Sequence, residues 1–297
     1  MARNGTYYLG RVIKTGALET EHIKSALRSS ESFTTYGSSW TFLDVEELSD
    51  GSATYFFGRL VKYDPDAEVT VVDPEARREV RQREPNMTIA SSPFVYIPDH
   101  QGLAFLHVAG QISYETFMSR WSSVVNASHF QILSNCSVEA VSDIESFTKK
   151  VKALDNIYFI SSTVSPPNPM FGPLWENLKN YLVSRKTDRM KIEEDGAPAQ
   201  PINTELAQHM ERMLVDEEAS SPLSETLPIG DAAILMAVDG YGKGVIRGKR
   251  GDKIVTIKTS ETTMNFTFPR DPDPFGLYKK AAGVFEEIKS QRHMRHS

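Results

Sequence analysis

The densest cluster of chemically active side chains is a basic stretch near the C-terminal end. Between Lys243 and Lys258, six cations stand against one acid, Asp252, which gives a local net charge of +5. Cations spaced along two antiparallel strands can follow a phosphate backbone or enter a groove of duplex DNA. The candidate nucleic-acid contacts are Lys243, Arg247, Lys249, Arg250, Lys253 and Lys258. The alternative interpretation is a solvated hairpin whose charges bind nothing.

A second set of candidates consists of carboxylates that could hold a divalent metal. Asp44 and Glu46 lie two residues apart on an expected strand, so both would point to one face, and Gly37-Ser38 precedes them as in nucleotidyltransferases. Asp99 follows a proline at a turn, as at the start of a metal-dependent nuclease signature. The spacing of the first pair is too short for that family, and the strand after Asp99 offers His107 in place of an acid-x-Lys motif. Metal-dependent catalysis by Asp44, Glu46 and Asp99 is therefore the alternative, and we expect no catalytic residue, no bound metal and no cofactor.

Two further features do not predict chemistry. The stretch Gly240–Gly244 lacks the Ser or Thr after Lys243, and the following helix, that a Walker phosphate loop requires, so it indicates a glycine-rich turn. Cys136 is the single cysteine of the sequence, which excludes an internal disulfide framework and a thiolate metal cluster.

Composition limits the class of protein. The chain has 297 residues, of which 40% are hydrophobic and 24% charged, as in soluble globular proteins. No run approaches the roughly 20 apolar residues of a membrane span, and the N-terminus lacks a signal-peptide core, so we expect a cytoplasmic protein without membrane insertion. The formal net charge of -6 argues against coating of nucleic acid by bulk charge, so binding would need a local patch.

The patterns of the first part predict hairpins mixed with helices. Strands are expected at 7–13, 40–48, 53–63, 69–72, 94–97 and 103–108, and helices at 19–28 and 113–125. Ser113 is a suitable N-cap for the second helix. The charged segment 73–84 has mixed signs, which favour an exposed helix or loop.

The rest of the chain continues with strand, helix and strand at 130–135, 142–154 and 156–163, and helices at 174–185 and 203–215. Three strands, 232–238, 253–258 and 263–268, and a last helix, 275–290, complete it. This order predicts an α+β fold: antiparallel hairpins packed with helices, plus a smaller C-terminal β-unit closed by the last helix. The expected domains are an N-terminal body at 1–192, a linker at 193–203 and a C-terminal unit at 204–297.

The order of elements resembles that of RexA-like phage-exclusion proteins, over about two thirds of the chain. The resemblance rests on the strand Tyr7–Arg11, the strand Gly37–Phe42 with its partner Ala53–Tyr63, and Ser92–Ile97 with Gly102–Phe105 and the helix that follows. The chain is also similar to bacterial proteins found among defence and prophage genes. The resemblance implies a non-catalytic, dimeric binder of double-stranded DNA, and it designates no contact residue.

Three functional hypotheses follow. The leading one is a cytoplasmic bacterial or prophage-encoded protein that binds double-stranded DNA in antiviral defence, as a homodimer and without chemistry of its own. The alternatives are a metal-dependent nucleic-acid enzyme, such as a nuclease or nucleotidyltransferase toxin, and a protein-interaction module that engages an effector partner. DNA and RNA are not distinguished by the sequence.

Overall fold

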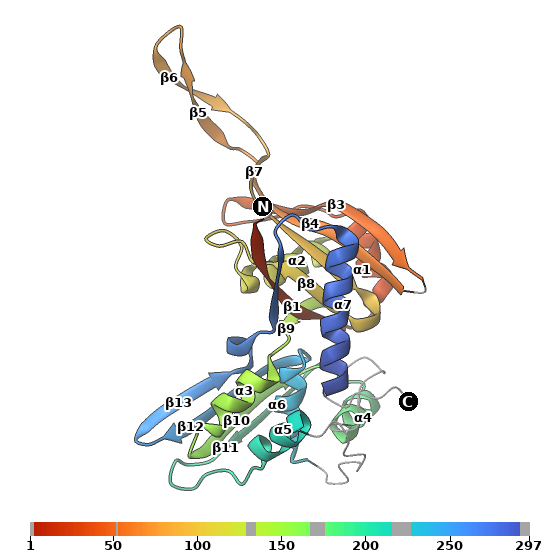
Figure 1. The fold of residues 1–297 in the computed structure, drawn as a ribbon, viewed down its shortest axis with the longest axis vertical. Helices are drawn as coiled ribbons and strands as arrows, with labels where there is room; N and C mark the ends of the chain where they lie inside the picture. The colour runs from red at the N-terminus through yellow and green to blue at the C-terminus, as the bar shows by residue number, and fades with distance from the viewer. Residues whose placement is uncertain (1–2, 52, 129–134, 167–175, 216–226, 292–297) are drawn as a thin grey trace.

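The computed structural model describes residues 3–51, 53–128, 135–166, 176–215 and 227–291. These residues form two antiparallel sheets with associated helices, together with a projecting two-stranded ribbon (Figure 1). The predicted α+β class is thereby confirmed. In the described part of the chain, no helix combines the length and the apolar character needed to cross a membrane.

The first sheet is built around β1. Its strand order is β14-β1-β8-β7-β4-β3-β2, and β9 pairs with the C-terminal half of β1, on the same edge as β14. The strands are β1 (Asn4–Thr15), β2 (Phe33–Thr35), β3 (Ser38–Asp50), β4 (Ala53–Asp64), β7 (Met87–Ile97), β8 (Gly102–Leu106), β9 (Asn135–Ala140) and β14 (Asn265–Pro269). A short 3-10 helix, η1 (Pro98–His100), links β7 to β8.

Helices cover both faces of the first sheet, because its strands carry apolar side chains on both faces. Phe56 belongs to the core beneath α1 (Thr20–Arg28) and α2 (Tyr114–Ala127). Its neighbours Tyr55 and Phe57 point the other way, into the core beneath α7 (Pro274–Gln291). The last helix, expected to close the C-terminal unit, therefore packs on the first sheet instead.

The second sheet has the order β11-β10-β12-β13 and helices on one face. Its strands are β10 (Asn156–Val164), β11 (Met190–Asp195), β12 (Gly242–Arg250) and β13 (Lys253–Lys258). The helices that contribute to its core are α3 (Ile144–Lys152), α4 (Glu176–Ser184), α5 (Leu206–Val215) and α6 (Ile229–Val238). A 3-10 helix, η3 (Thr259–Thr262), leads from β13 back toward β14.

The segment 232–238, predicted as a strand, is helical. Every residue from Gly230 to Val238 is buried, and all of them except Asp231 are apolar or glycine. The segment therefore shows no helical periodicity that would distinguish it from a buried strand. The C-terminal end of this helix carries a sequence signal that the prediction did not use. Gly240 has φ +87°, its N–H donates to Ala237, and the N–H of Tyr241 donates to Met236, which is the hydrogen-bond pattern of a glycine-terminated helix.

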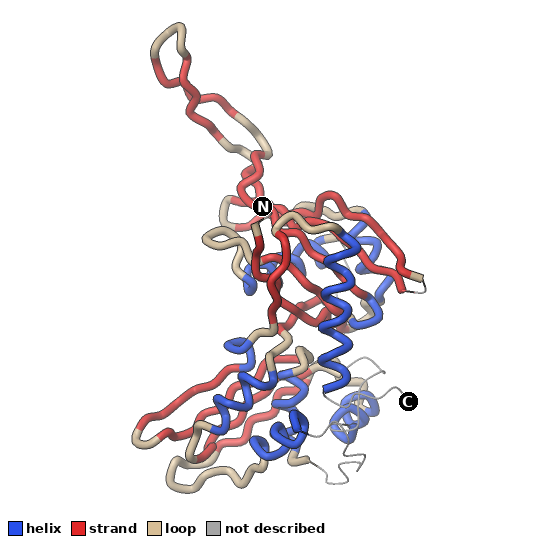
Figure 2. Tube along the Cα trace, in the orientation of Figure 1, coloured by secondary structure: helices blue, strands red, loops and turns tan. Residues whose placement is uncertain are grey.

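The segment 73–84, predicted as an exposed helix or loop, belongs instead to a β-ribbon. Strands β5 (Glu68–Asp73) and β6 (Arg78–Arg83) pair with each other and extend away from the first sheet (Figures 1 and 2). Val71 and Val80 are directly opposite each other in the ribbon. Because Val80 is the one β-branched residue of segment 73–84, that segment carried no alternation that would predict a strand.

The expected linker at 193–203 is built into the second sheet. Residues 193–195 are the last part of β11 and pair with β10. Beyond them, Gly196 N–H donates to the Tyr158 carbonyl and Ile202 N–H to the Ile157 carbonyl. Strand pairing therefore crosses the expected domain boundary. Most of the predicted strand at 130–135 lies outside the described residues, and β9 begins at Asn135.

The two sheets are joined at the β1 edge by a buried cation. Arg11, 1% exposed, donates hydrogen bonds to the carbonyl oxygens of Asp239 and His100. Its guanidinium carbon lies 5.5 Å from the centroid of the Tyr241 ring and 5.2 Å from that of Phe285. Arg11 thus connects β1 with the end of α6 and with α7.

Candidate nucleic-acid interface

The basic hairpin forms as expected from its turn. Gly251 lies between β12 and β13 with φ +60°, a conformation that glycine adopts without a steric penalty. Its N–H donates to the Asp155 carboxylate at 2.6 Å, which ties the turn to the start of β10. Arg250 pairs with Lys253 at the turn, and Val245 pairs with Lys258 at the other end.

The glycines of β12 serve packing rather than phosphate binding. A Cβ at Gly242 would lie 2.0 Å from the Thr163 carbonyl oxygen, and one at Gly248 would lie 2.2 Å from that of Asn156. Both residues are buried, on the side of β12 that also carries Ile246 into the core beneath the helices. The glycine-rich stretch at 240–244 is thus a helix end followed by a strand.

Four of the six candidate cations lie on the opposite side of the sheet. Lys243, Arg247 and Lys249 alternate with the buried residues of β12, and Lys258 joins them because it pairs with Val245 of the same face. Described residues of that face are exposed or half-buried, and none belongs to a core cluster. The second sheet therefore has one face covered by helices and one open face (Figure 1).

Arg250 and Lys253 do not share this face. They are exposed at the tip of the hairpin, and strand alternation points both toward the side of the helices, beyond the end of the core. The structure thus divides the predicted site into an open-face group of four and a tip pair.

The open face also contains residues outside the predicted set of contacts. Register places Phe159 of β10 beside Arg247, and the guanidinium carbon lies 4.4 Å from the centroid of the phenyl ring. Such a contact holds the planar cation against the sheet and contributes about 0.5–1 kcal/mol at an exposed site. Lys191 of β11 lies on the same face through its partner Thr163. We call the five cations of this surface the basic face: Lys191, Lys243, Arg247, Lys249 and Lys258.

Acids compensate only part of the basic face. Lys191 forms an ion pair with Glu193 at 2.7 Å, and Lys243 forms one with Glu139 at 3.5 Å. Burial raises the pKa of the Glu139 carboxyl, and the neighbouring Lys243 opposes that rise. Arg247, Lys249 and Lys258 form no ion pair within 4 Å among the described residues. Glu193 lies on the same face, where its contact with Lys191 lowers the pKa of its carboxyl and the charge of Arg247 contributes to that lowering.

Three cations on the helices that cover the other face of this sheet are compensated. Lys149 pairs with Glu145 at 2.6 Å, Lys152 pairs with Glu211, and Arg212 lies 3.7 Å from Glu205. Because these charges already have acidic partners, they are poor candidates for phosphate contacts. The cations of the two faces therefore differ in ion pairing as well as in position.

The carboxylates considered for metal catalysis do not converge. Asp44 lies at a β-bulge between Leu43 and Glu46 with φ +53°, which breaks the simple alternation that would put Asp44 and Glu46 on one face. Its carboxylate lies 3.8 Å from the Arg59 guanidinium. Asp99 lies in η1, the short helix that follows β7, and is on a different element from Asp44 and Glu46 of β3. Across the described ranges, no group of three or more His, Cys, Asp or Glu side chains is arranged to hold a metal ion.

The fold and the site define an α+β protein with two antiparallel sheets, one of which has an open basic face. Residues 20–221 match the family model described as a domain of unknown function, DUF4747. The match covers more than half of the chain, and the protein belongs to this family. The matched region ends at residue 221, before β12 begins, so most of the basic face lies outside it. No curated protein matches the chain.

Proposed function

We propose that this protein binds double-stranded DNA through the basic face, without chemistry of its own. The observation that supports the proposal is the group Arg247, Lys249 and Lys258. These three cations form no ion pair with the residues that the structure describes, and they lie on a sheet face that no described helix covers. They stand out because the whole chain has a net charge of -6. An acidic molecule with one uncompensated basic surface orients that surface toward a polyanion.

Contacts of this kind act on phosphates rather than on bases. Lysine and arginine side chains that neutralise phosphates release condensed counterions, and the resulting affinity does not depend on sequence. The hydroxyl groups of Thr163 and Thr256 lie on the same face and can add hydrogen bonds to phosphate oxygens. We therefore expect similar affinity for duplexes of unrelated sequence.

The biological setting is part of the same proposal. The order of elements resembles that of RexA-like proteins, which supports a role in phage defence as a cytoplasmic homodimer. An effector partner would then carry out any step that DNA binding does not itself perform.

The experiment compares two triple variants with equal changes in net charge. Arg247→Gln/Lys249→Gln/Lys258→Gln removes the uncompensated cations, and Lys149→Gln/Lys152→Gln/Arg212→Gln removes paired cations from the helical side. Fluorescence anisotropy with labelled duplexes of two unrelated sequences measures affinity at low salt. We expect the open-face variant to lose about tenfold or more on both duplexes and the control variant to remain within about twofold of wild type. Equal losses in the two variants would refute a localised interface.

The absence of chemistry has its own test. Asp44→Ala/Glu46→Ala should bind the duplex as tightly as wild type, because neither carboxylate lies on the basic face. Wild-type protein incubated with labelled DNA and Mg²⁺ or Mn²⁺ should leave the DNA unchanged. Metal-dependent cleavage or nucleotide addition that this double variant abolishes would favour the enzyme instead.

A further inference from the structure

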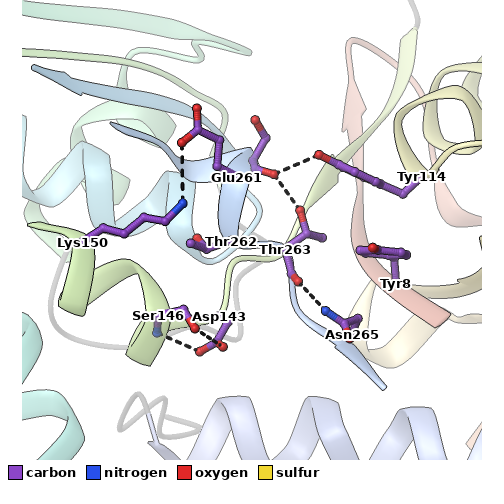
Figure 3. A pocket seen from close by; sticks show the side chains of 10 residues that line it. Tyr8, Tyr114, Asp143, Ser146, Lys150, Glu261, Thr262, Thr263 and Asn265 are labelled. Atoms are coloured by element: carbon purple, nitrogen blue, oxygen red, sulfur yellow. Dashed lines mark hydrogen bonds and ion pairs between the residues drawn. The ribbon is translucent and has the colours of Figure 1, made fainter. Parts of the chain in front are cut away.

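A cleft of about 380 Å³ lies where the two sheets meet (Figure 3). Tyr8 of β1, Tyr114 of α2 and Asn265 of β14 line it from the first sheet. From the other side it is lined by Lys150 of α3 and by Glu261 of η3. Clefts of roughly 300–1,000 Å³ between structural units are typical small-molecule sites.

The first wall presents a rigid aromatic surface. The rings of Tyr8 and Tyr114 stack with centroids 4.8 Å apart and planes 21° apart. The Tyr114 hydroxyl donates to the Ser260 carbonyl oxygen at 3.1 Å, and burial raises the pKa of this phenol to about 12, so it stays a neutral donor. The His107 ring lies against Tyr8 edge-on, with centroids 5.9 Å apart. Tyr8 is therefore held by two rings, and it lines the cleft (Figure 3).

The cleft offers paired donors and acceptors. The Asn265 amide uses one N–H on the Thr263 carbonyl oxygen at 3.0 Å, which leaves a second N–H and its own oxygen for a ligand. Lys150 Nζ and Glu261 Oε2 are 3.7 Å apart, an ion-pair distance too long for a hydrogen bond, so both groups keep hydrogen-bonding capacity. Adjacent donors and acceptors of this kind match the edges of a nucleobase.

The charge of the lining excludes a phosphate group. Asp143 and Glu261 are acidic, whereas Lys150 is the one cation among the residues that line the cleft. The Asp143 oxygens accept hydrogen bonds from the backbone of Glu145 and from Ser146, which fix the carboxylate as the cap of α3. A phosphate in the cleft would therefore meet a net negative surface.

We propose that this cleft binds a neutral nucleoside. Its base stacks on Tyr8, and its edge is hydrogen-bonded by Asn265 and by the Lys150–Glu261 pair. The inference stands apart from the proposed DNA interface, because it uses neither the basic face nor a phosphate contact.

Isothermal titration calorimetry with adenosine, guanosine, cytidine and uridine tests the proposal on the full chain. A ligand of this size in such a cleft should bind with a dissociation constant on the order of 0.1 mM. We expect at least one of the four nucleosides to bind in this range and its 5′-monophosphate to bind about fivefold or more weakly. The absence of binding by all four, or tighter binding of the monophosphate, would overturn the proposal.

Variants locate the site. Tyr8→Leu should weaken the nucleoside about fivefold or more through lost stacking, whereas Tyr36→Leu, at a tyrosine 95% exposed in a turn, should not. Asn265→Ala is a second variant at an exposed position and should weaken binding without disturbing the core. Glu261→Gln should reduce the discrimination against the monophosphate. Unchanged affinity in both Tyr8→Leu and Asn265→Ala would place any bound nucleoside elsewhere and refute the assignment.

Discussion

The buried carboxyl of Asp231 should make the stability of the protein depend on pH. Asp231 lies in the first turn of α6 and is 1% exposed, and the Thr204 hydroxyl lies 2.7 Å and 2.8 Å from its two oxygens. Burial is the main cause that raises the pKa of this carboxyl from 3.8 to about 6, and nearby Glu194 and Glu205 raise it further. The hydrogen bond from Thr204 opposes the rise.

The direction follows from linkage between protonation and folding. The pKa is higher in the folded state than in the unfolded state, so this group stabilises the fold fully below pH 3.8, and the contribution is lost as pH rises through about 6. A difference of this size corresponds to up to about 3 kcal/mol between pH 4 and pH 7.5. Asp231→Asn removes the ionisation and keeps an oxygen that can accept from Thr204. The variant should therefore match wild type near pH 4 and exceed its free energy of unfolding above pH 7.

Urea unfolding of both proteins at several pH values between 4 and 7.5 measures the effect. The difference between them isolates Asp231, because other titrating groups, such as Glu139 and His100, are common to both proteins. A difference that stays constant across this range would show that the carboxyl does not titrate there. It would refute the argument from burial.

Two further predictions concern the buried cation and the ribbon. Arg11→Met should lower the free energy of unfolding by about 3 kcal/mol in urea titrations. The substitution removes the buried hydrogen bonds to the Asp239 and His100 carbonyls that link the two sheets. A loss below about 1 kcal/mol would contradict this role. Replacing Glu68–Arg83 by Asn-Gly should leave the melting temperature within about 2 °C. The ribbon has no extensive packing against another described element, and the Glu84 N–H already donates to the Ala67 carbonyl at its base. A drop of about 5 °C or more would mean that the ribbon supports the first sheet.

Local signals in the sequence were sufficient for most of the hairpins and most of the helices. The strands expected at 40–48 and 53–63 leave room for only a short turn, and Gly51 in that turn has φ +63° in the structure. Ser113 was predicted as the N-cap of α2, and its hydroxyl oxygen accepts from the Thr116 N–H. Each of these features is decided by residues within a few positions of one another, and the sequence displays them directly.

Features that depend on distant partners could not be predicted in the same way. The apolar side of α7 was evident, but its packing partner was not, because either sheet could bury Leu277 and Phe285. The helix α6 has no polar side to reveal its period, and it was mistaken for a strand. In both cases the outcome depends on tertiary contacts with residues distant in the sequence. Local sequence patterns do not reveal those contacts.

The candidate interface shows the same division. The cations of β12 and β13 were evident from composition, and alternation separates Arg247 from Arg250 once the strand is known. Phe159 and Lys191 could not be assigned, because β10 and β11 meet β12 only through sheet order. That Arg247 forms no ion pair with a described residue is likewise a property of the folded surface.

The central claim, that the basic face binds duplex DNA, is tested most directly by the salt dependence of affinity. Each phosphate neutralised on duplex DNA contributes about -0.9 to the slope of log affinity against log salt concentration. With Arg247, Lys249 and Lys258 each engaging one phosphate, wild type should show a slope of about -3 or steeper, and the triple Gln variant a slope less negative by about three units. A wild-type slope near zero, or an identical slope in the variant, would contradict the account.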